Sequence, residues 1–240
     1  MIKSLKARAH EFSATEKQLQ QLNSGPFEAG SLDSFQQHLQ RTNQYPLKPS
    51  KLEIFQVNVG YMCNQVCKHC HVDAGPDRKE IMTQETMQQC INVIAANNIH
   101  TLDLTGGAPE MNPNFRWFVE NAVAAGIKEV IVRSNLTIIR ANPKYYDLPE
   151  FFAKHNVRVV SSLPYYKRGK TDRQRGDGVF DKSIEALQML NTVGYAKPES
   201  GLTLDLVYNP SGAFLPGDQA QLEMEFKSTL LEDFDIRFNS

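Results

Sequence analysis

The sequence has few cysteines, a single tryptophan and no excess of charge of either sign. Its 240 residues include four cysteines, and the formal net charge is -1. A near-neutral chain lacks the basic surface that nucleic-acid binding requires, so nucleic acid is not an expected partner. No apolar run approaches the ~18 residues of a membrane span, so no membrane partner is expected either. Because no apolar core follows the basic N-terminus, we expect no secretory signal and a cytoplasmic protein.

The cysteines are concentrated in one place. Cys63, Cys67 and Cys70 form a C-x3-C-x2-C segment, whereas a disulfide scaffold would spread its cysteines along the chain. Thiolates are the natural ligands of iron–sulfur clusters, and three thiolates leave one iron of a four-iron cluster open to another ligand. The alternative is zinc with His69 or His71 as fourth ligand, although structural zinc usually takes ligand pairs from two separated segments.

The rest of the chain predicts an α/β fold preceded by a helical extension. Residues 1–50 are polar and predict helices at Ala14–Leu22 and Ser31–Gln40, whereas residues 51–240 alternate strands with helices. The expected strands are Leu52–Val59, Ile99–Leu104, Glu129–Arg133, Val157–Ser162, Leu202–Val207 and Phe234–Phe238. The expected helices between them are Thr83–Asn97, Phe115–Ala125, Leu148–His155, Asp181–Val193 and Leu215–Leu231. Six such units predict parallel strands with right-handed crossovers, as a partial (β/α)6 TIM-like barrel.

Parallel sheets carry their functional residues at the carboxyl ends of the strands. The cysteine segment follows the first strand, Thr105–Glu110 the second, Ser134 and Asn135 the third, and Ser161 ends the fourth. The basic segment Lys167–Phe180 comes after the carboxyl end of the fourth strand, at the same edge. We interpret it as a mobile lid over the substrate, with a plain solvated loop as the alternative. Cys90 and Trp117 are interpreted as packing residues.

The cysteine segment, with the aromatic His69 directly before its last cysteine, resembles the signature of the radical S-adenosylmethionine (SAM) superfamily. The resemblance implies that Cys63, Cys67 and Cys70 hold a [4Fe–4S] cluster. It also implies that SAM binds the fourth iron and is split by one electron into methionine and a deoxyadenosyl radical. Gly106 and Gly107 match the family's Gly-Gly-Glu-like segment, but Ala108 stands where glutamate is common. The SAM-binding candidates are therefore His69, Gly106, Gly107, Ala108, Pro109, Glu110, Ser134, Asn135 and Ser161.

Four longer segments resemble the arsenosugar biosynthesis radical SAM family. They are residues 52–76, 102–110, 133–137 and 171–178. The resemblance implies transfer of the deoxyadenosyl group to trivalent dimethylarsenic, with dimethylarsinous acid as substrate and a reductant protein such as flavodoxin or ferredoxin. Members of that family continue into a cysteine-rich C-terminal region, so we expect a chain truncated at Ser240. Two alternatives stay open: another small-molecule or peptide substrate, and a non-catalytic iron–sulfur or zinc-binding module.

Overall fold

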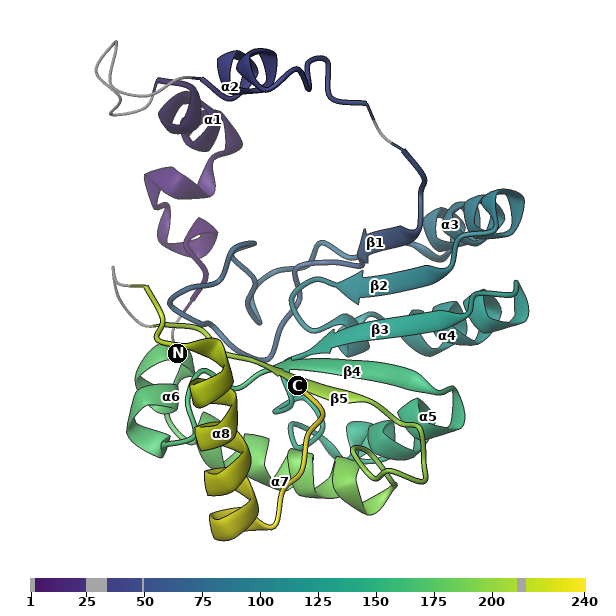
Figure 1. Cartoon of the computed structure of the whole chain (residues 1–240), viewed down its shortest axis with the longest axis vertical. Helices are drawn as coiled ribbons and strands as arrows, with labels where there is room; N and C mark the ends of the chain where they lie inside the picture. Colours follow the sequence, from purple (N-terminus) through teal and green to yellow (C-terminus); the bar gives the residue numbers. More distant parts are fainter. Residues whose placement is uncertain (1–2, 25–33, 49, 211–214) are drawn as a thin grey trace.

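A computed structural model describes residues 3–24, 34–48, 50–210 and 215–240. Its centre is one parallel sheet in the order β1-β2-β3-β4-β5 (Figure 1). The strands are β1 (Ile54–Asn58), β2 (Thr101–Thr105), β3 (Glu129–Ser134), β4 (Val157–Ser162) and β5 (Leu204–Val207). All five therefore end at the same edge of the sheet, where the loop after β1 and the short helix α6 also lie. The predicted α/β partial barrel is confirmed, with five strands in the described part of the chain.

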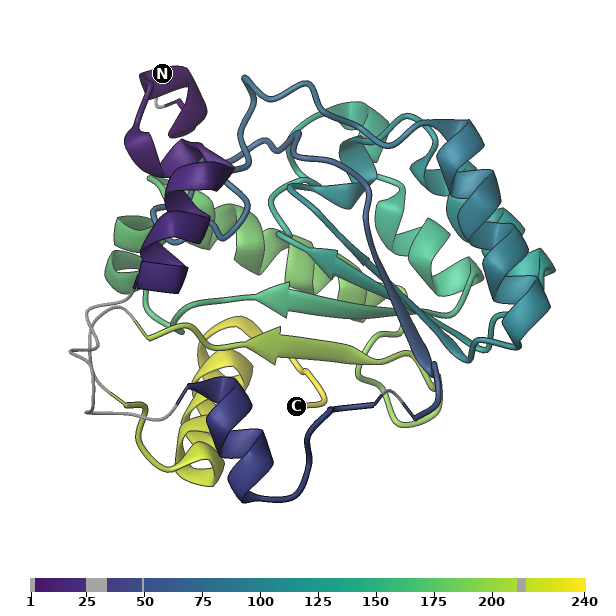
Figure 2. The same ribbon diagram turned by 90° about the horizontal axis from the view of Figure 1, so that it is seen from above.

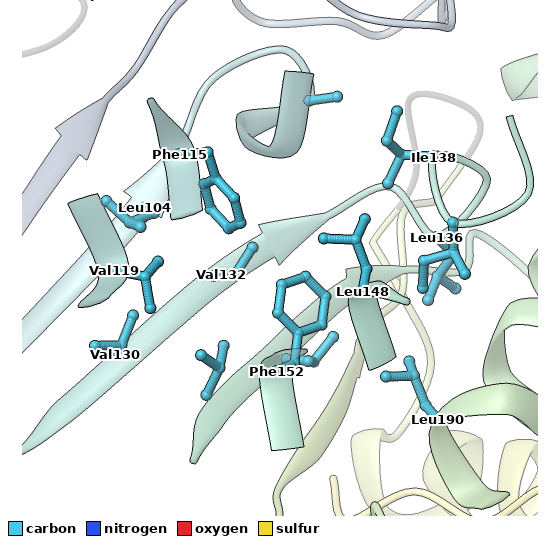
Figure 3. Close-up of a cluster of buried hydrophobic side chains, with 14 of the residues drawn as sticks. Leu104, Phe115, Val119, Val130, Val132, Leu136, Ile138, Leu148, Phe152 and Leu190 are labelled. Carbon is cyan, nitrogen blue, oxygen red and sulfur yellow. The ribbon is translucent and has the colours of Figure 1, made fainter. Parts of the chain in front are cut away.

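Helices between the strands cover one face of this sheet (Figure 2). They are α3 (Gln84–Asn97), α4 (Phe115–Ala124), α5 (Leu148–Lys154) and α7 (Val179–Thr192), with short 3-10 helices η3 (Pro109–Met111) and η4 (Pro143–Tyr145). The short helix α6 (Arg168–Arg175) lies at the strand ends instead. Alternate strand residues such as Leu104, Val130 and Val132 point toward these helices and are fully buried against Phe115 and Phe152 (Figure 3). No helix among the described residues is both long and apolar enough to cross a membrane.

The opposite face of the sheet is polar. Gln56 of β1 donates a 2.7 Å hydrogen bond to Asp103 of β2, and Asp103 pairs with Arg133 of β3 at 2.8 Å. Farther along the sheet, Arg158 of β4 pairs with Asp205 of β5 at 2.7 Å. Because an all-parallel sheet is usually covered on both faces, a polar second face indicates the interior of an open barrel rather than a second helical layer.

The N-terminal extension contains 3-10 turns η1 (Lys6–Arg8) and η2 (Glu11–Ser13) and two helices, α1 (Thr15–Ser24) and α2 (Phe35–Arg41). Of the helix expected at Ser31–Gln40, residues 31–33 lie outside the described part, and α2 begins where Ser34 and Gln37 form a capping box. The extension touches the loop after β1, since the Ser4 hydroxyl binds Asp77 and the Leu5 N–H binds Asp73 at 2.5 Å.

Two expectations are wrong. The sixth strand, Phe234–Phe238, does not form, because α8 runs over Gln219–Phe234 and ends at Asp235, which adopts a left-handed conformation. The terminal residues instead lie along β5 without forming a strand. The Leu206 N–H donates to the Ser240 oxygen at 2.8 Å, and the Asn239 N–H donates to the Leu204 oxygen at 2.7 Å. The segment Lys167–Phe180 is not a loop: its centre forms α6, which Gly176 terminates with a φ of 118°.

Candidate active site

A cavity of about 490 Å3 opens at the carboxyl ends of the strands. Its walls come from the loop after β1, the ends of β2 to β5 and the last residue of α6. The residues that line it are Gln56, Cys63, Gln65, Cys67, His69, Cys70, His71, Val72, Ala74, Thr105, Gly106, Gly107, Arg133, Ser134, Asn135, Val160, Ser162, Arg175, Val207 and Asn209. The three clustered cysteines thus share one chamber, whereas Cys90 lies half-buried on α3 beside the core.

Backbone hydrogen bonds hold the cysteine loop in place. The Cys63 N–H binds the Gly75 oxygen at 3.2 Å, and the Gly75 N–H returns to the Tyr61 oxygen at 3.1 Å. The Cys70 N–H binds the Cys67 oxygen at 3.2 Å, so the last two cysteines share one tight turn. The short spacing in the sequence therefore becomes a loop whose two ends are tied together, with its thiols facing the cavity.

Two of the three sulfurs accept measured N–H bonds from the surrounding protein. Cys63 Sγ accepts from the Gln65 backbone and from the Asn135 side chain, both at 3.4 Å, and Cys70 Sγ accepts from the Ala74 backbone at 3.2 Å. Hydrogen bonds to thiolate sulfur are a regular feature of iron–sulfur sites, where they influence the reduction potential. The loop therefore offers these sulfurs the surroundings that cluster thiolates need.

Burial acts against ionisation of the thiols. It raises the pKa of Cys63 to about 11, with smaller opposing contributions from Gln65 and Asn135. It also raises the pKa of Cys67, and the nearby Arg175 guanidinium opposes that effect. A bound metal deprotonates a coordinating thiol outright, so these cysteines suit a permanently bound cationic centre better than service as free nucleophiles.

The donor set fits a three-thiolate cluster. Among the described residues, no three Cys, His, Asp or Glu side chains are gathered as a single metal ion would require. A four-iron cubane is broader than one ion, and the three thiols that line the chamber would each hold one of its irons. Cys63, Cys67 and Cys70 would hold the cluster, and His69, whose buried Nδ1 has no partner, lies beside it.

The glycine pair after β2 is also needed for the packing of the cysteine loop. A Cβ on Gly106 would lie 2.6 Å from the Gly60 oxygen, and a Cβ on Gly107 would overlap the Met62 carbonyl. The backbone instead donates from Gly107 to Gly60 and from Ala108 to Met62, each at 2.9 Å. These glycines are required because the cysteine loop crosses directly over them, although both also line the cavity.

The structure divides the expected SAM-binding residues into two groups. His69, Gly106, Gly107, Ser134 and Asn135 line the cavity, whereas Ala108, Pro109, Glu110 and Ser161 do not. Neighbouring residues on a strand point to opposite faces, so Ser162 faces the cavity while Ser161 is 1% exposed on the core side. Asn135 contacts Cys63, which places this side chain beside a cluster ligand.

Glu110 lies buried behind the glycine pair. It is 5% exposed, and neither carboxylate oxygen has a hydrogen-bond partner among the described residues. Burial raises the pKa of this carboxyl to about 7. The family often has a glutamate at the position of Ala108, and Glu110 does not supply that carboxylate to the cavity wall.

Sequence reasoning overlooked Arg175 as a site residue and placed it in a mobile lid. The side chain is 6% exposed, lines the cavity and donates to the carbonyl oxygen of Ser162 at the end of β4. Gln56 and Asn209 also line the cavity without having been expected. The sequence signals for Arg175 were its place in the basic segment after the fourth strand and in a segment that resembles the arsenosugar family.

Comparison with known proteins agrees with this geometry. Residues 57–209 match the family model described as "Radical SAM superfamily". The chain is 27% identical to the mycofactocin maturase MftC of Mycobacterium tuberculosis over 171 residues, which cover 71% of this chain and 41% of MftC. It is 24% identical to the subtilosin biosynthesis protein AlbA of Bacillus subtilis, over 56% of this chain and 29% of AlbA. It therefore spans less than half the length of these relatives.

Solved structures share the fold. SuiB of Streptococcus suis bound to S-adenosylmethionine superposes with a TM-score of 0.56 at 13% identity, covering 98% of this chain and 53% of SuiB. The matched family segment contains Cys63, Cys67 and Cys70 and extends over more than half of the residues. The chain accordingly belongs to the radical SAM superfamily, whose members use a [4Fe–4S] cluster and S-adenosylmethionine as cofactors.

Proposed function

We propose that this chain is the radical SAM core of an enzyme that transfers the deoxyadenosyl group of SAM to trivalent dimethylarsenic. The bound cofactors would supply one-electron cleavage of SAM. Cys63, Cys67 and Cys70 would bind the cluster, and Asn135 and the Ala74 N–H would orient its sulfurs. The dimethylarsenic substrate, expected as dimethylarsinous acid, would enter the same chamber.

One observation carries the proposal for this substrate. Residues from all four segments that resemble the arsenosugar family meet at the cavity, although the segments are far apart in the sequence. Gln56 and the cysteines come from residues 52–76, Gly106 from 102–110, Asn135 from 133–137 and Arg175 from 171–178. Cluster and SAM binding, which the whole superfamily shares, would account for the first three segments, so the fourth segment, which brings Arg175 to the cavity, is the one that supports a shared reaction.

We also propose His69, Gly106, Gly107 and Ser134 as contacts of SAM, since they line the cavity beside the cysteines. The electron for cleavage would come from a reductant protein such as flavodoxin or ferredoxin. The organisation into an extension at 1–50 and a core at 51–240 is likewise a proposal. It is supported by the change from exposed helices to an alternating sheet near residue 50.

A second candidate is modification of a peptide. The relatives include a maturase, MftC, and a bacteriocin biosynthesis protein, AlbA. SuiB is also known in a structure with its precursor peptide SuiA, at a TM-score of 0.57 to this chain. These likenesses support a peptide substrate; they extend over 56% of this chain for AlbA and 95% for SuiB, but they concern the fold as a whole and not particular residues of the cavity.

Anaerobic reconstitution with iron and sulfide, followed by reduction and addition of SAM, tests the proposal. We expect about four irons per chain and formation of deoxyadenosine. With dimethylarsinous acid present, mass spectrometry should find an adduct of deoxyadenosine and dimethylarsenic. Cys67→Ala should abolish iron uptake and SAM cleavage, because it removes one of three cluster ligands.

Cys90→Ala is the matched control, since Cys90 lies on α3 outside the cavity, and it should retain iron and activity. Deoxyadenosine without an arsenic adduct would contradict the proposed substrate and leave the peptide candidate. Uptake of one zinc per chain in place of iron would contradict the cluster itself.

A further inference from the structure

Arg175 is a buried cation without an acidic partner. Its side chain is 6% exposed, and among the described residues it forms no ion pair with any carboxylate. Its one measured bond goes to the uncharged Ser162 carbonyl, and its Nε is buried without a partner. Burying an unpaired charge is costly. An arginine in this position therefore needs an anion in the chamber that it lines.

The cysteine loop would bring negative charge into this chamber once its thiols bind a cluster as thiolates. Arg175 and the three cysteines line the same cavity, and the 3.2 Å bond from the Lys68 N–H to the Gln174 oxygen brings the neighbour of Cys67 against the neighbour of Arg175. Cys67 is also the one cysteine of the three with no measured N–H bond to its sulfur, because the bonds from Gln65, Asn135 and Ala74 go to the other two. The Arg175 guanidinium is thus placed at the sulfur that lacks a donor.

The segment around Arg175 is built to keep this arginine at the loop. The Lys68 N–H, between Cys67 and Cys70, donates to the Gln174 oxygen at 3.2 Å. The Thr171 hydroxyl donates to the Tyr165 oxygen at 2.7 Å and anchors the start of α6. Asp172 accepts the Phe180 N–H at 2.8 Å and so ties α6 to α7. These bonds fix both ends of the helix, and with them the position of its last residue.

We propose that Arg175 is the counter-ion of the iron–sulfur cluster, donating from its guanidinium to the Cys67 sulfur and raising the cluster's reduction potential. A cubane with three thiolates is an anion, and reduction adds one more negative charge. A fixed positive charge at its edge stabilises the reduced form more than the oxidised form. This role concerns the cluster alone and holds whatever the substrate is.

A redox titration followed by electron paramagnetic resonance, without SAM or substrate, tests the role. Arg175→Met keeps much of the side-chain volume and removes the charge. At a fixed applied potential we expect its ratio of reduced to oxidised cluster to fall about tenfold, which corresponds to about 59 mV for a one-electron couple. Arg175→Lys retains a charge and should recover part of the difference. Arg173→Met, an exposed arginine on the same helix, should match the wild type.

Iron content and circular dichroism separate this role from a structural one. If Arg175→Met folds but takes up no iron while Arg175→Lys does, the charge is needed to hold the cluster, and the proposal is supported. An unchanged potential in fully loaded Arg175→Met overturns it. Loss of iron from both folded variants also overturns it, because packing against Ser162 would then be the role. A wild-type potential with weakened SAM binding would instead assign Arg175 to the SAM carboxylate.

Discussion

At the scale of single residues, the site differs from its sequence motif mainly in which side chains reach the chamber. Ser162 faces the cavity and Ser161 the core, and Asn135 binds a cysteine sulfur. Arg133 lines the chamber, but its guanidinium already forms an ion pair with the Asp103 carboxylate at 2.8 Å. Burial raises the pKa of the Glu110 carboxyl, yet Glu110 does not line the cavity. We therefore expect the titration of Glu110 to affect the free energy of unfolding.

Glu110 should make the protein less stable as the pH rises. Burial raises its pKa from 4.5 to about 7, so between these values the unfolded chain releases a proton that the folded protein retains. The free energy of unfolding then falls as pH rises through that range, by an amount on the order of 3 kcal/mol. Urea unfolding of Glu110→Gln at several pH values should lack this part of the slope.

Glu150→Gln, which changes an exposed carboxylate on α5, should keep the wild-type slope. A Glu110→Gln variant with the same pH dependence as the wild type would show that the carboxyl is already ionised or solvated in the fold.

At the scale of elements, the site depends on contacts between loops that follow different strands. The loop after β1 crosses the loop after β2 at Gly106 and Gly107, and it meets the end of α6 at Gln174. The cysteine loop is therefore held from two sides. Its shape depends on the absence of a side chain at the crossing point.

Gly107→Ala should destabilise the protein by about 1–3 kcal/mol, the usual cost of overpacking. The added methyl would overlap the Met62 carbonyl and lie 3.0 Å from the Ala74 Cβ, so the cysteine loop would have to shift. Denaturant unfolding measures the stability, and iron content after reconstitution reports on the loop.

Gly169→Ala is the matched control, because a Cβ at this exposed position on α6 has no atom within 4 Å. It should be neutral or stabilise the helix by about 0.5–1 kcal/mol. Equal stability and iron content in the two variants would disprove the close approach at Gly107.

At the scale of the whole molecule, the N-terminal extension reaches the cysteine loop. The backbone N–H groups of Leu5 and Lys6 donate to the Asp73 carboxylate at 2.5 and 2.9 Å, and Lys6 pairs with Glu80 at 2.5 Å. Arg78 links Asp73 to Glu80 from the other side. The first residues of the described chain thus cover the outer side of the loop that holds the cysteines.

Asp73→Asn should loosen this contact, because it removes the charge and one acceptor oxygen while asparagine still tolerates the left-handed backbone at this position. A hydrogen bond to a charged group contributes about 1.5–3 kcal/mol, so tryptic cleavage near Lys6 should accelerate at least about tenfold. Loss of iron to a chelator should also be faster.

Asp147→Asn removes an exposed carboxylate that pairs with Arg116 outside the cavity, and it should change neither rate. Wild-type cleavage and chelation rates in Asp73→Asn would mean that the extension does not support the loop.

The sequence alone determined the features that depend on short spacing and local periodicity. The C-x3-C-x2-C segment fixes three thiols in one loop, and alternating strand and helix patterns predict the parallel sheet from which that loop emerges. The failure at Phe234–Phe238 has a local cause too, since α8 continues through the start of the segment. The basic segment was misread because it is rich in charge and has no side-chain N-cap bond, so no local signal marks the start of α6.

Only the tertiary structure decided which residues meet. The contacts of Arg175 with the cysteine chamber, of Asn135 with Cys63 and of Gly107 with Met62 join segments far apart in the chain. No local pattern encodes them, because they follow from how β1 to β4 pair and how their loops pack at one edge. Spacing along the chain selects the ligands, whereas packing across the sheet sets their charge and hydrogen-bonding environment.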